Sequence, residues 1–179
     1  VKQRISKDQH MLKAIEHVED VRILNQDFEQ TLLSFILSSN NTINAVRRLA
    51  RKLSIKYGKK IVVDGKDFFT FPKAEDIASS DEKEIRSLGI GFRSPYLLKA
   101  AQKLSEDKVN NLMHKDENEI RAYLTSYKGV GNKIADCVMV FSLKQTAVTP
   151  LDVWGKRILV DLYGVDSKLN YQKMREWYK

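Results

Sequence analysis

Cysteine is nearly absent from this chain of 179 residues, which contains Cys137 and no other thiol. A single cysteine excludes a disulfide within the chain, and it excludes a zinc or iron–sulfur site built from four cysteines of the chain. The three histidines, His10, His17 and His114, show no spacing typical of metal ligands, and we interpret His10 and His17 as solvated or interfacial helix residues. The sequence therefore predicts no metal site made of side chains.

Long apolar runs are also missing. No stretch reaches the length of a transmembrane helix, and the first residues carry no signal-peptide pattern. We therefore expect a soluble intracellular protein with no membrane partner, in the cytoplasm or nucleoid of a prokaryote or in the nucleus of a eukaryote. The chain begins at Val1 instead of methionine and stops at Lys179 within a segment of helical pattern, so either end could be incomplete.

Acidic residues are outnumbered, with 23 Asp and Glu against 31 Lys and Arg, which gives a net charge of +8 and a pI near 9.5. A basic balance favours a polyanionic partner such as nucleic acid, although lysine-rich genomes raise the same count. The length suits one medium domain or two small helical lobes with a buried core.

Apolar residues recur at helical spacing along most of the chain and predict an all-α fold of about ten helices. The only strand-like residues are Ile61, Val62 and Val63, within a region of loop signals from 58 to 73. Helical segments are expected at about 8–20, 27–37, 43–53, 81–88, 95–104, 116–127, 132–143, 152–162 and 169–179.

Several helix starts are marked by capping residues. Asp27 and Asp152 have the pattern of N-caps, and Asp116 with Glu119 three residues later forms a capping box. Ser94 before Pro95 predicts an N-cap followed by proline at the first helical position.

A short turn, Gly129-Val130-Gly131, joins the helical segments 116–127 and 132–143. We expect Gly129 to end the first of these helices as its C′ residue. Glycines let a phosphate approach the backbone, and the amides and dipole at the start of the second helix favour negative charge. An ordinary helix–helix turn has the same pattern, so the motif alone leaves both interpretations open.

Lys133, just after this turn, and Asp152, 19 residues further along the chain, form a candidate catalytic pair. A lysine at the start of a helix can act in its neutral form as a nucleophile on an electron-poor sugar carbon, giving a Schiff base. Asp152, which follows Pro150-Leu151, can stabilise a developing oxocarbenium or assist proton transfer. Plain helix capping is the alternative for Asp152, and a basic contact is the alternative for Lys133.

Two polar or glycine-rich loops interrupt the apolar pattern. Residues 38–42, Ser-Ser-Asn-Asn-Thr, separate two helical segments and indicate a wet, functional edge. Phe92 and Arg93 follow Gly89 and Gly91, and an aromatic beside an arginine can either stack on bases or cap the core.

Four stretches, taken in order, resemble the helix-hairpin-helix DNA glycosylases of the HhH-GPD superfamily, and among them most of all the 8-oxoguanine DNA glycosylase/AP lyases. The resemblance runs from Val21 to about Tyr163, and its most specific stretches are Leu33–Asn41, Leu88–Arg93, Gly129–Cys137 and Ala147–Val153.

The resemblance implies a two-lobed helical fold. One lobe would comprise 1–30 and 150–179, and the other 31–149 with the helix-hairpin-helix at 117–143. The family's N-terminal β domain and its C-terminal helix with the base-clamping residues have no counterpart in these residues.

The resemblance also implies a base-excision-repair glycosylase with β-lyase activity that removes oxidised purine, most of all 8-oxoguanine. Lys133 would be the nucleophile, Asp152 the catalytic carboxylate, and Cys137 would line the damaged-base pocket. No cofactor is expected, because the lysine does the covalent work.

The expected partner is double-stranded DNA with a damaged base, bound by a monomer. Asn40 would fill the place of the extruded nucleotide, Phe92 would wedge into the stack, and Arg93 would bind the orphaned cytosine. Contacts to the DNA backbone are expected from Lys128, Gly129, Val130, Gly131 and Trp154. Hairpin carbonyls in this superfamily often bind a monovalent cation.

Three residues depart from the family pattern. Lys128 replaces a proline, Ala45 replaces a second cytosine-reading arginine, and Trp154 replaces a histidine. The alternatives are therefore another glycosylase of this superfamily, acting on oxidised pyrimidines or mismatches, and a noncatalytic DNA-binding module. A purely structural helical protein would lack salt-dependent DNA affinity.

Overall fold

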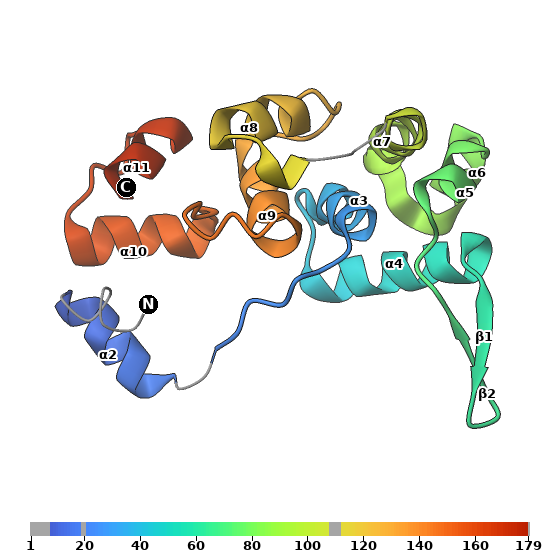
Figure 1. Ribbon diagram of the computed structural model, residues 1–179, viewed down its shortest axis with the longest axis horizontal. Coiled ribbons are helices and arrows are strands. Elements are labelled where there is room, and N and C mark those ends of the chain that lie inside the picture. The colour runs from blue at the N-terminus through green and yellow to red at the C-terminus, as the bar shows by residue number, and fades with distance from the viewer. Residues whose placement is uncertain (1–7, 19–20, 108–111, 179) are drawn as a thin grey trace. The chain divides into compact units, whose positions relative to one another are not determined.

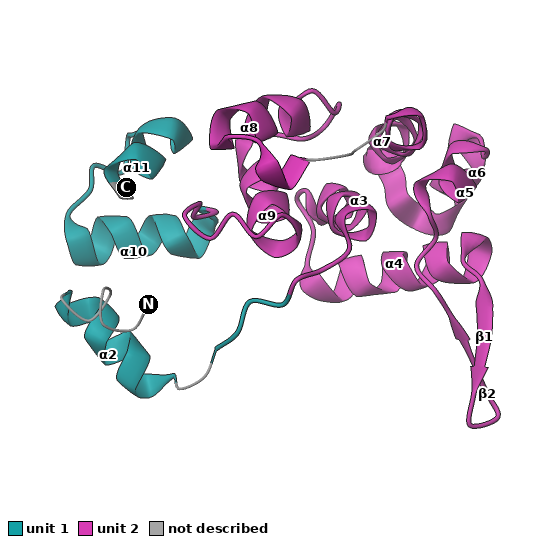
Figure 2. Cartoon of the chain, in the orientation of Figure 1, with its two compact units in different colours: residues 1–24, 151–179 teal, residues 25–150 magenta. Residues whose placement is uncertain are grey.

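A computed structural model describes residues 8–18, 21–107 and 112–178. The chain divides into two compact units, which comprise 1–24 with 151–179 (unit 1) and 25–150 (unit 2), as coloured in Figure 2. Helices dominate both units (Figure 1), so the expected all-α class is confirmed. Among the described residues no helix is long and apolar enough to cross a membrane.

Unit 2 is built around α3 (Phe28–Ser38), which packs against α4 (Ile43–Tyr57), α7 (Ser94–Glu106) and α9 (Asn132–Ser142). Leu32, Leu33, Ile36 and Leu37 are at most 1% exposed, so α3 is buried on most of its circumference. Each such side chain stabilises the fold by roughly 2 kcal/mol relative to an exposed position. The remaining helical elements of the unit are α5 (Ala74–Ala78), α6 (Glu82–Ile85), η1 (Arg86–Ile90), η2 (Gly91–Arg93), η3 (Leu112–His114) and α8 (Glu117–Thr125).

The helices α8 and α9 form a hairpin that is held by a buried ion pair. Arg121 on α8 donates to Asp136 on α9, whose side chain is fully buried, and it also donates to Glu117 at 2.8 Å. Because a charge inside a protein needs an opposite charge nearby, this pair fixes one helix against the other. It therefore fixes the turn that joins them.

One antiparallel hairpin accompanies the helices, with β1 (Lys60–Val63) paired to β2 (Lys66–Phe69) in the register Lys60↔Phe69. The two-residue turn uses Asp64 and Gly65, both with positive φ, as a type I′ turn requires. The sequence indicated β1 only. The β2 strand was missed because Lys66 and Asp67 break the apolar pattern, although the Asp-Gly pair was a usable hairpin signal.

Unit 1 contains α2 (Gln9–His17), α10 (Val153–Tyr163) and α11 (Tyr171–Tyr178). Its core consists of Leu151, Leu159, Val165 and Met174. The hydroxyl of Tyr163 donates to Asp8 at 3.0 Å, which ties the start of α2 to the end of α10. The parts of the expected terminal helices at 19–20 and at Lys179 lie outside the described residues.

Most helix starts expected from local chemistry are confirmed. Asp27 accepts from the Gln30 amide at 2.9 Å, Asp152 accepts from the Gly155 amide at 2.8 Å, and Asp116 forms its capping box with Glu119. The helices α9 and α10 begin where the sequence placed them.

The expected N-cap at Ser94 is wrong. Ser94 is the first residue of α7, and both its backbone N–H and its hydroxyl donate to the carbonyl of Gly91. The reason is that the 3₁₀ turn η2 runs directly into α7, so backbone carbonyls supply what a capping side chain would supply.

The expectation that Gly129 is the C′ residue of the preceding helix is also wrong. The helix α8 ends at Thr125 with Ser126 as its C-cap, and Gly129 lies further along the turn with φ of +89°. A Cβ on Gly129 would lie 2.8 Å from Cγ of Tyr96. Glycine is therefore required here by a left-handed backbone and by close packing against Tyr96, instead of by a helix end.

Candidate functional site

The start of α9 is an expected part of the site whose binding groups are backbone amides instead of side chains. Gly131 is its N-cap residue and offers no side-chain hydrogen bond, whereas α3, α4, α8 and α10 are capped by side chains of Asp27, Thr42, Asp116 and Asp152. The first amides of an uncapped helix point outward with the positive end of the dipole. This end of α9 can therefore bind an anion such as a phosphate.

The residues of the turn before α9 divide into two roles. Gly129 and Gly131 are exposed, and a Cβ on Gly131 would meet nothing within 4 Å. Val130 has its side chain in the core, and its N–H donates to the carbonyl of Tyr127 at 3.0 Å. The Val130 amide is thus already used inside the turn, a role that the sequence did not predict. The side chain of Lys128 is exposed beside the turn.

Lys133 lies in the first turn of α9 and is half-buried. Its Nζ is 5.2 Å from the centre of the Phe35 ring on α3, and Phe35 in turn stacks on Phe141 with 5.8 Å between ring centres. The amine therefore rests on an aromatic surface that restricts its access to water. Cys137 follows one turn later on the same helix and is 3% exposed. Residues four apart share a helix face, so Lys133 and Cys137 lie on one side of α9.

Asn40 and Arg93 are joined directly, although they are far apart in the sequence. The Arg93 guanidinium donates through Nε to the carbonyl of Ser39 at 2.7 Å and through Nη2 to the carbonyl of Asn40 at 2.8 Å. A longer bond of 3.4 Å reaches the carbonyl of Ile90. Arg93 is 9% exposed, and Asn40 has a positive φ of 48°. Arg93 thus holds the backbone of Asn40 in a left-handed conformation that asparagine tolerates.

Phe92 completes this group on the surface of unit 2. Its side chain is 53% exposed, and the guanidinium carbon of Arg93 lies 4.4 Å from its ring centre. An exposed ring held on one face by a buried, hydrogen-bonded guanidinium is suited to insertion between stacked groups. The structure therefore brings together Asn40, Phe92 and Arg93. The expected contact of Arg93 with a cytosine stays a prediction, and that contact would have to replace the backbone carbonyls.

Asp152 and Trp154 belong to unit 1. The Asp152 carboxylate caps α10, and its side chain is exposed. Trp154 is 67% exposed and lies beside the Arg157 guanidinium, 5.2 Å from the ring centre. Asp152 thus acts as a helix cap in the structure, which is the alternative that its sequence context allowed. Its catalytic role stays a prediction.

Phe35 is a site residue that the sequence did not single out. Its apolar spacing in the segment 27–37 indicated burial and nothing more, and the residue that it supports is 98 positions away. No local sequence signal distinguishes a core phenylalanine from one whose ring contacts a lysine amine.

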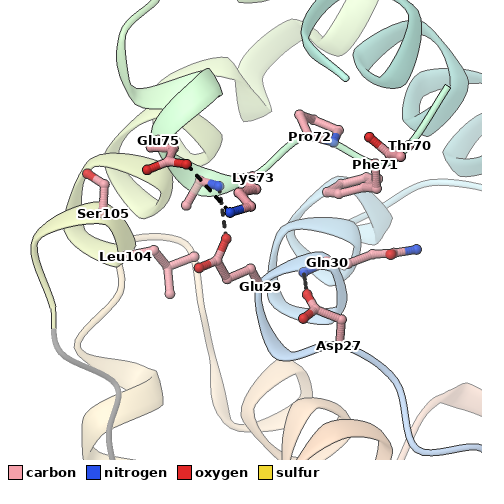
Figure 3. Close-up of a pocket in the computed structure, with 11 residues that line it drawn as sticks. Asp27, Glu29, Gln30, Thr70, Phe71, Pro72, Lys73, Glu75, Leu104 and Ser105 are labelled. Atoms are coloured by element: carbon pink, nitrogen blue, oxygen red, sulfur yellow. Dashed lines mark hydrogen bonds and ion pairs between the residues drawn. The ribbon is translucent and has the colours of Figure 1, made fainter. Parts of the chain in front are cut away.

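A cavity of about 460 Å³ in unit 2 lies between the starts of α3 and α5 (Figure 3). Glu29 points into it and accepts a hydrogen bond from the Ala74 amide at 2.9 Å, which fixes α5 to α3. None of the expected site residues lines this cavity. Among the described residues there is also no group of three or more His, Cys, Asp or Glu placed to hold a metal ion.

Comparison with known sequences relates the chain to one family. The family model described as HhH-GPD superfamily base excision DNA repair protein matches residues 33–179. The chain is 34% identical over 169 residues to the N-glycosylase/DNA lyase of Saccharomyces cerevisiae, covering 87% of this chain and 45% of the yeast protein. It is 30% identical to the N-glycosylase/DNA lyase OGG1 of Arabidopsis thaliana, covering 88% and 46%. The chain thus spans about half the length of these curated relatives.

Solved structures agree with the sequence comparison. MBOgg1 in complex with a low-affinity DNA ligand has a TM-score of 0.93 and 35% identity, over 98% of this chain and 61% of that chain. A Clostridium acetobutylicum 8-oxoguanine glycosylase/lyase, bound to double-stranded DNA with cytosine opposite 8-oxoguanine, has a TM-score of 0.91 and 32% identity, over 98% and 61%.

Proposed function

The chain belongs to the HhH-GPD superfamily of base excision DNA repair proteins, and from this premise we propose that it is a bifunctional DNA glycosylase and AP lyase. We propose 8-oxoguanine as its substrate, because relatives that match it in sequence and structure carry that name. The observation that supports the activity most strongly is the position of Lys133, in the first turn of an uncapped helix and on the ring of Phe35.

Lys133 acts as the nucleophile in this proposal. Its neutral amine attacks C1′ of the flipped nucleotide, the bond from C1′ to the base breaks, and the base leaves with the electron pair and takes up a proton. The amine then loses a proton and the sugar ring opens, with its oxygen protonated, to give an iminium between Nζ and C1′. Loss of a proton from C2′ expels the 3′ phosphate with the electron pair of the C3′–O bond. Water finally releases the lysine.

The amides at the start of α9 and the exposed Gly129 and Gly131 hold a phosphate of the damaged strand, with Lys128 beside them. A monovalent cation at the hairpin carbonyls would strengthen this contact. Asn40 fills the place of the extruded nucleotide, and Phe92 wedges into the stack beside it. Removing a base from the stack costs a few kcal/mol, which these contacts offset.

Four further assignments belong to the same proposal. Asp152 stabilises the positive charge that develops on the sugar, and Cys137 lines the pocket for the damaged base. Trp154 packs against the DNA backbone. The protein acts as an intracellular monomer on double-stranded DNA.

Base release and strand cleavage on a duplex with 8-oxoguanine opposite cytosine test the activity. We expect both products with the wild-type protein, neither with Lys133→Gln, and both with the control Lys83→Gln, which removes an exposed lysine of α6 that has no part in the proposed binding or chemistry. Duplexes with thymine glycol or a G·T mismatch identify another glycosylase specificity if they are cleaved instead. Binding without base release from any of these duplexes would indicate a noncatalytic module.

A further inference from the structure

The helix α4 has an unusual charge. Five of its fifteen residues are basic and none is acidic. These residues are Arg47, Arg48, Arg51, Lys52 and Lys56. The helix therefore contributes more than half of the net charge of +8 that the whole chain carries.

The two lysines have structural roles inside unit 2. Lys52 donates to the carbonyl of Leu88 at 2.9 Å, which ties α4 to η1. Lys56 forms an ion pair with Glu84 at 2.7 Å, which ties it to α6. Both side chains are thus accounted for by contacts within the protein.

The three arginines differ from the lysines in this respect. Over the described ranges 8–18, 21–107 and 112–178, no acidic side chain pairs with Arg47, Arg48 or Arg51. Asp67 lines a hollow of about 420 Å³ together with Arg51, but its carboxylate is paired with Lys60 at 2.8 Å. Like charges one helical turn apart repel each other, so this arrangement is unfavourable until an anion neutralises it.

The arginines lie away from the core side of the helix. Leu49 and Leu53 are buried against unit 2, whereas Arg47, Arg48 and Arg51 are all exposed. With 3.6 residues per turn, Arg48 and Arg51 fall opposite the leucines. Arg47 and Arg51 are separated by about 6 Å along the axis, close to the rise of two base steps on one DNA strand.

The same helix begins beside the proposed DNA-opening group. Its N-cap, Thr42, comes two residues after Asn40, and the Asn40 carbonyl is held by Arg93. Counted from Ile43, the first residue of α4, the arginines therefore lie about one to two helical turns along a single rigid element. A phosphate backbone that passes Asn40 can continue along this helix.

We propose that Arg47, Arg48 and Arg51 form a second phosphate-binding surface, which holds the backbone of duplex DNA next to the position where Asn40 and Phe92 enter it. This inference rests on the proposed function for the choice of duplex DNA as the partner. It assigns to the three arginines affinity and positioning, without any part in the covalent chemistry at Lys133.

The salt dependence of DNA binding tests this surface. We compare wild type with the variant Arg47→Gln/Arg48→Gln/Arg51→Gln on a duplex that holds an uncleavable abasic analogue, across a range of salt concentrations. The plot of log K against log salt concentration has a negative slope, and each lost phosphate contact makes it less steep by about 0.9. We therefore expect the magnitude of the slope to decrease by about 2 to 3 in the variant. A control, Lys66→Gln/Lys83→Gln/Lys99→Gln, makes the same charge change at exposed lysines elsewhere in unit 2. Its slope should stay near that of wild type.

An equal decrease in both variants, or no decrease in either, overturns the proposal. If three simultaneous substitutions make the helix unstable, the double variant Arg48→Gln/Arg51→Gln gives the same test with a decrease of about 1 to 2. The proposal is also overturned if the arginine variant binds single-stranded RNA less tightly than wild type does while its binding to the DNA duplex is unchanged. Single-turnover base release by wild type is measured in parallel, because its absence contradicts the proposed function while the slopes still report on the arginines.

Discussion

The Nη2 atom of Arg93 donates to the carbonyl oxygen of Asn40 at 2.8 Å, although 53 residues separate them in the sequence. The same guanidinium lies over the exposed ring of Phe92, with its carbon 4.4 Å from the ring centre. The residue proposed to replace the extruded nucleotide and the residue proposed to enter the stack are thus connected through one buried arginine. A change at Arg93 should therefore affect both.

Replacing Arg93 by lysine should impair the protein more than its retained charge suggests. Lysine cannot match the planar fork that reaches Ser39 and Asn40, so these part-buried carbonyls lose hydrogen bonds that contribute about 1 kcal/mol each. We expect lower stability in urea and slower single-turnover base release. Asn40→Gly is the matched control, since it keeps the positive φ and removes only the side chain. It should slow base release and leave stability nearly unchanged. If Arg93→Lys is as stable in urea as the wild-type protein, this account is contradicted.

The two glycines before α9 should respond differently to alanine. In Gly129→Ala the left-handed backbone costs about 1–2 kcal/mol, and the new Cβ also displaces Tyr96. Gly131→Ala has open space around its Cβ, so its stability should match wild type. If a phosphate rests on this turn, Gly131→Ala still weakens DNA binding. Thermal unfolding and a binding isotherm on both variants separate the two effects, and normal DNA affinity in Gly131→Ala would argue against the phosphate contact.

The buried pair of Arg121 and Asp136 should be essential for the hairpin of α8 and α9. Removing one member in Arg121→Met leaves a buried carboxylate without its arginine, and we expect a loss of about 3–5 kcal/mol in unfolding free energy. The double variant Arg121→Met/Asp136→Leu replaces both charges by apolar groups and should recover much of that loss. A double variant no more stable than Arg121→Met would show that the charges themselves are needed.

Tyr123 and Asp107 predict a defined pH dependence of stability. Burial raises the pKa of Tyr123 from 10.0 to about 12, and the hydrogen bond that Tyr123 donates lowers the pKa of Asp107. The raised pKa contributes stability below pH 10 that is lost as the pH rises through about 12. The lowered pKa contributes stability above pH 3.8 that is lost as the pH falls through the folded value.

The advantage of wild type over Tyr123→Phe should therefore be largest at neutral pH and shrink at both extremes. Urea unfolding from acid to alkaline pH measures it. A difference between the two proteins that stays constant above pH 10 would contradict the assignment to Tyr123.

Local chemistry predicted much of the fold and part of the site. The caps at Asp27, Asp116 and Asp152 each depend on residues within one helical turn, and so does the place of Lys133 at the start of α9. The contact of Lys133 with Phe35 could not be predicted, because it arises only when α3 packs on α9.

The role of Arg93 in holding Asn40 has the same origin, since nothing near either residue in the sequence indicates the other. The error at Ser94 was of a different kind. Its pattern with Pro95 is that of an N-cap, and the preceding 3₁₀ turn, which the sequence did not reveal, had already satisfied the helix start.

Borohydride trapping tests the central claim, that Lys133 attacks the sugar, most directly. Reduction of the iminium converts it to a stable amine and links the protein covalently to a duplex with 8-oxoguanine opposite cytosine. We expect an adduct with wild type, its mass located on the peptide that carries Lys133, and no adduct with Lys133→Gln. An adduct on another residue, or one that persists in Lys133→Gln, would contradict the account.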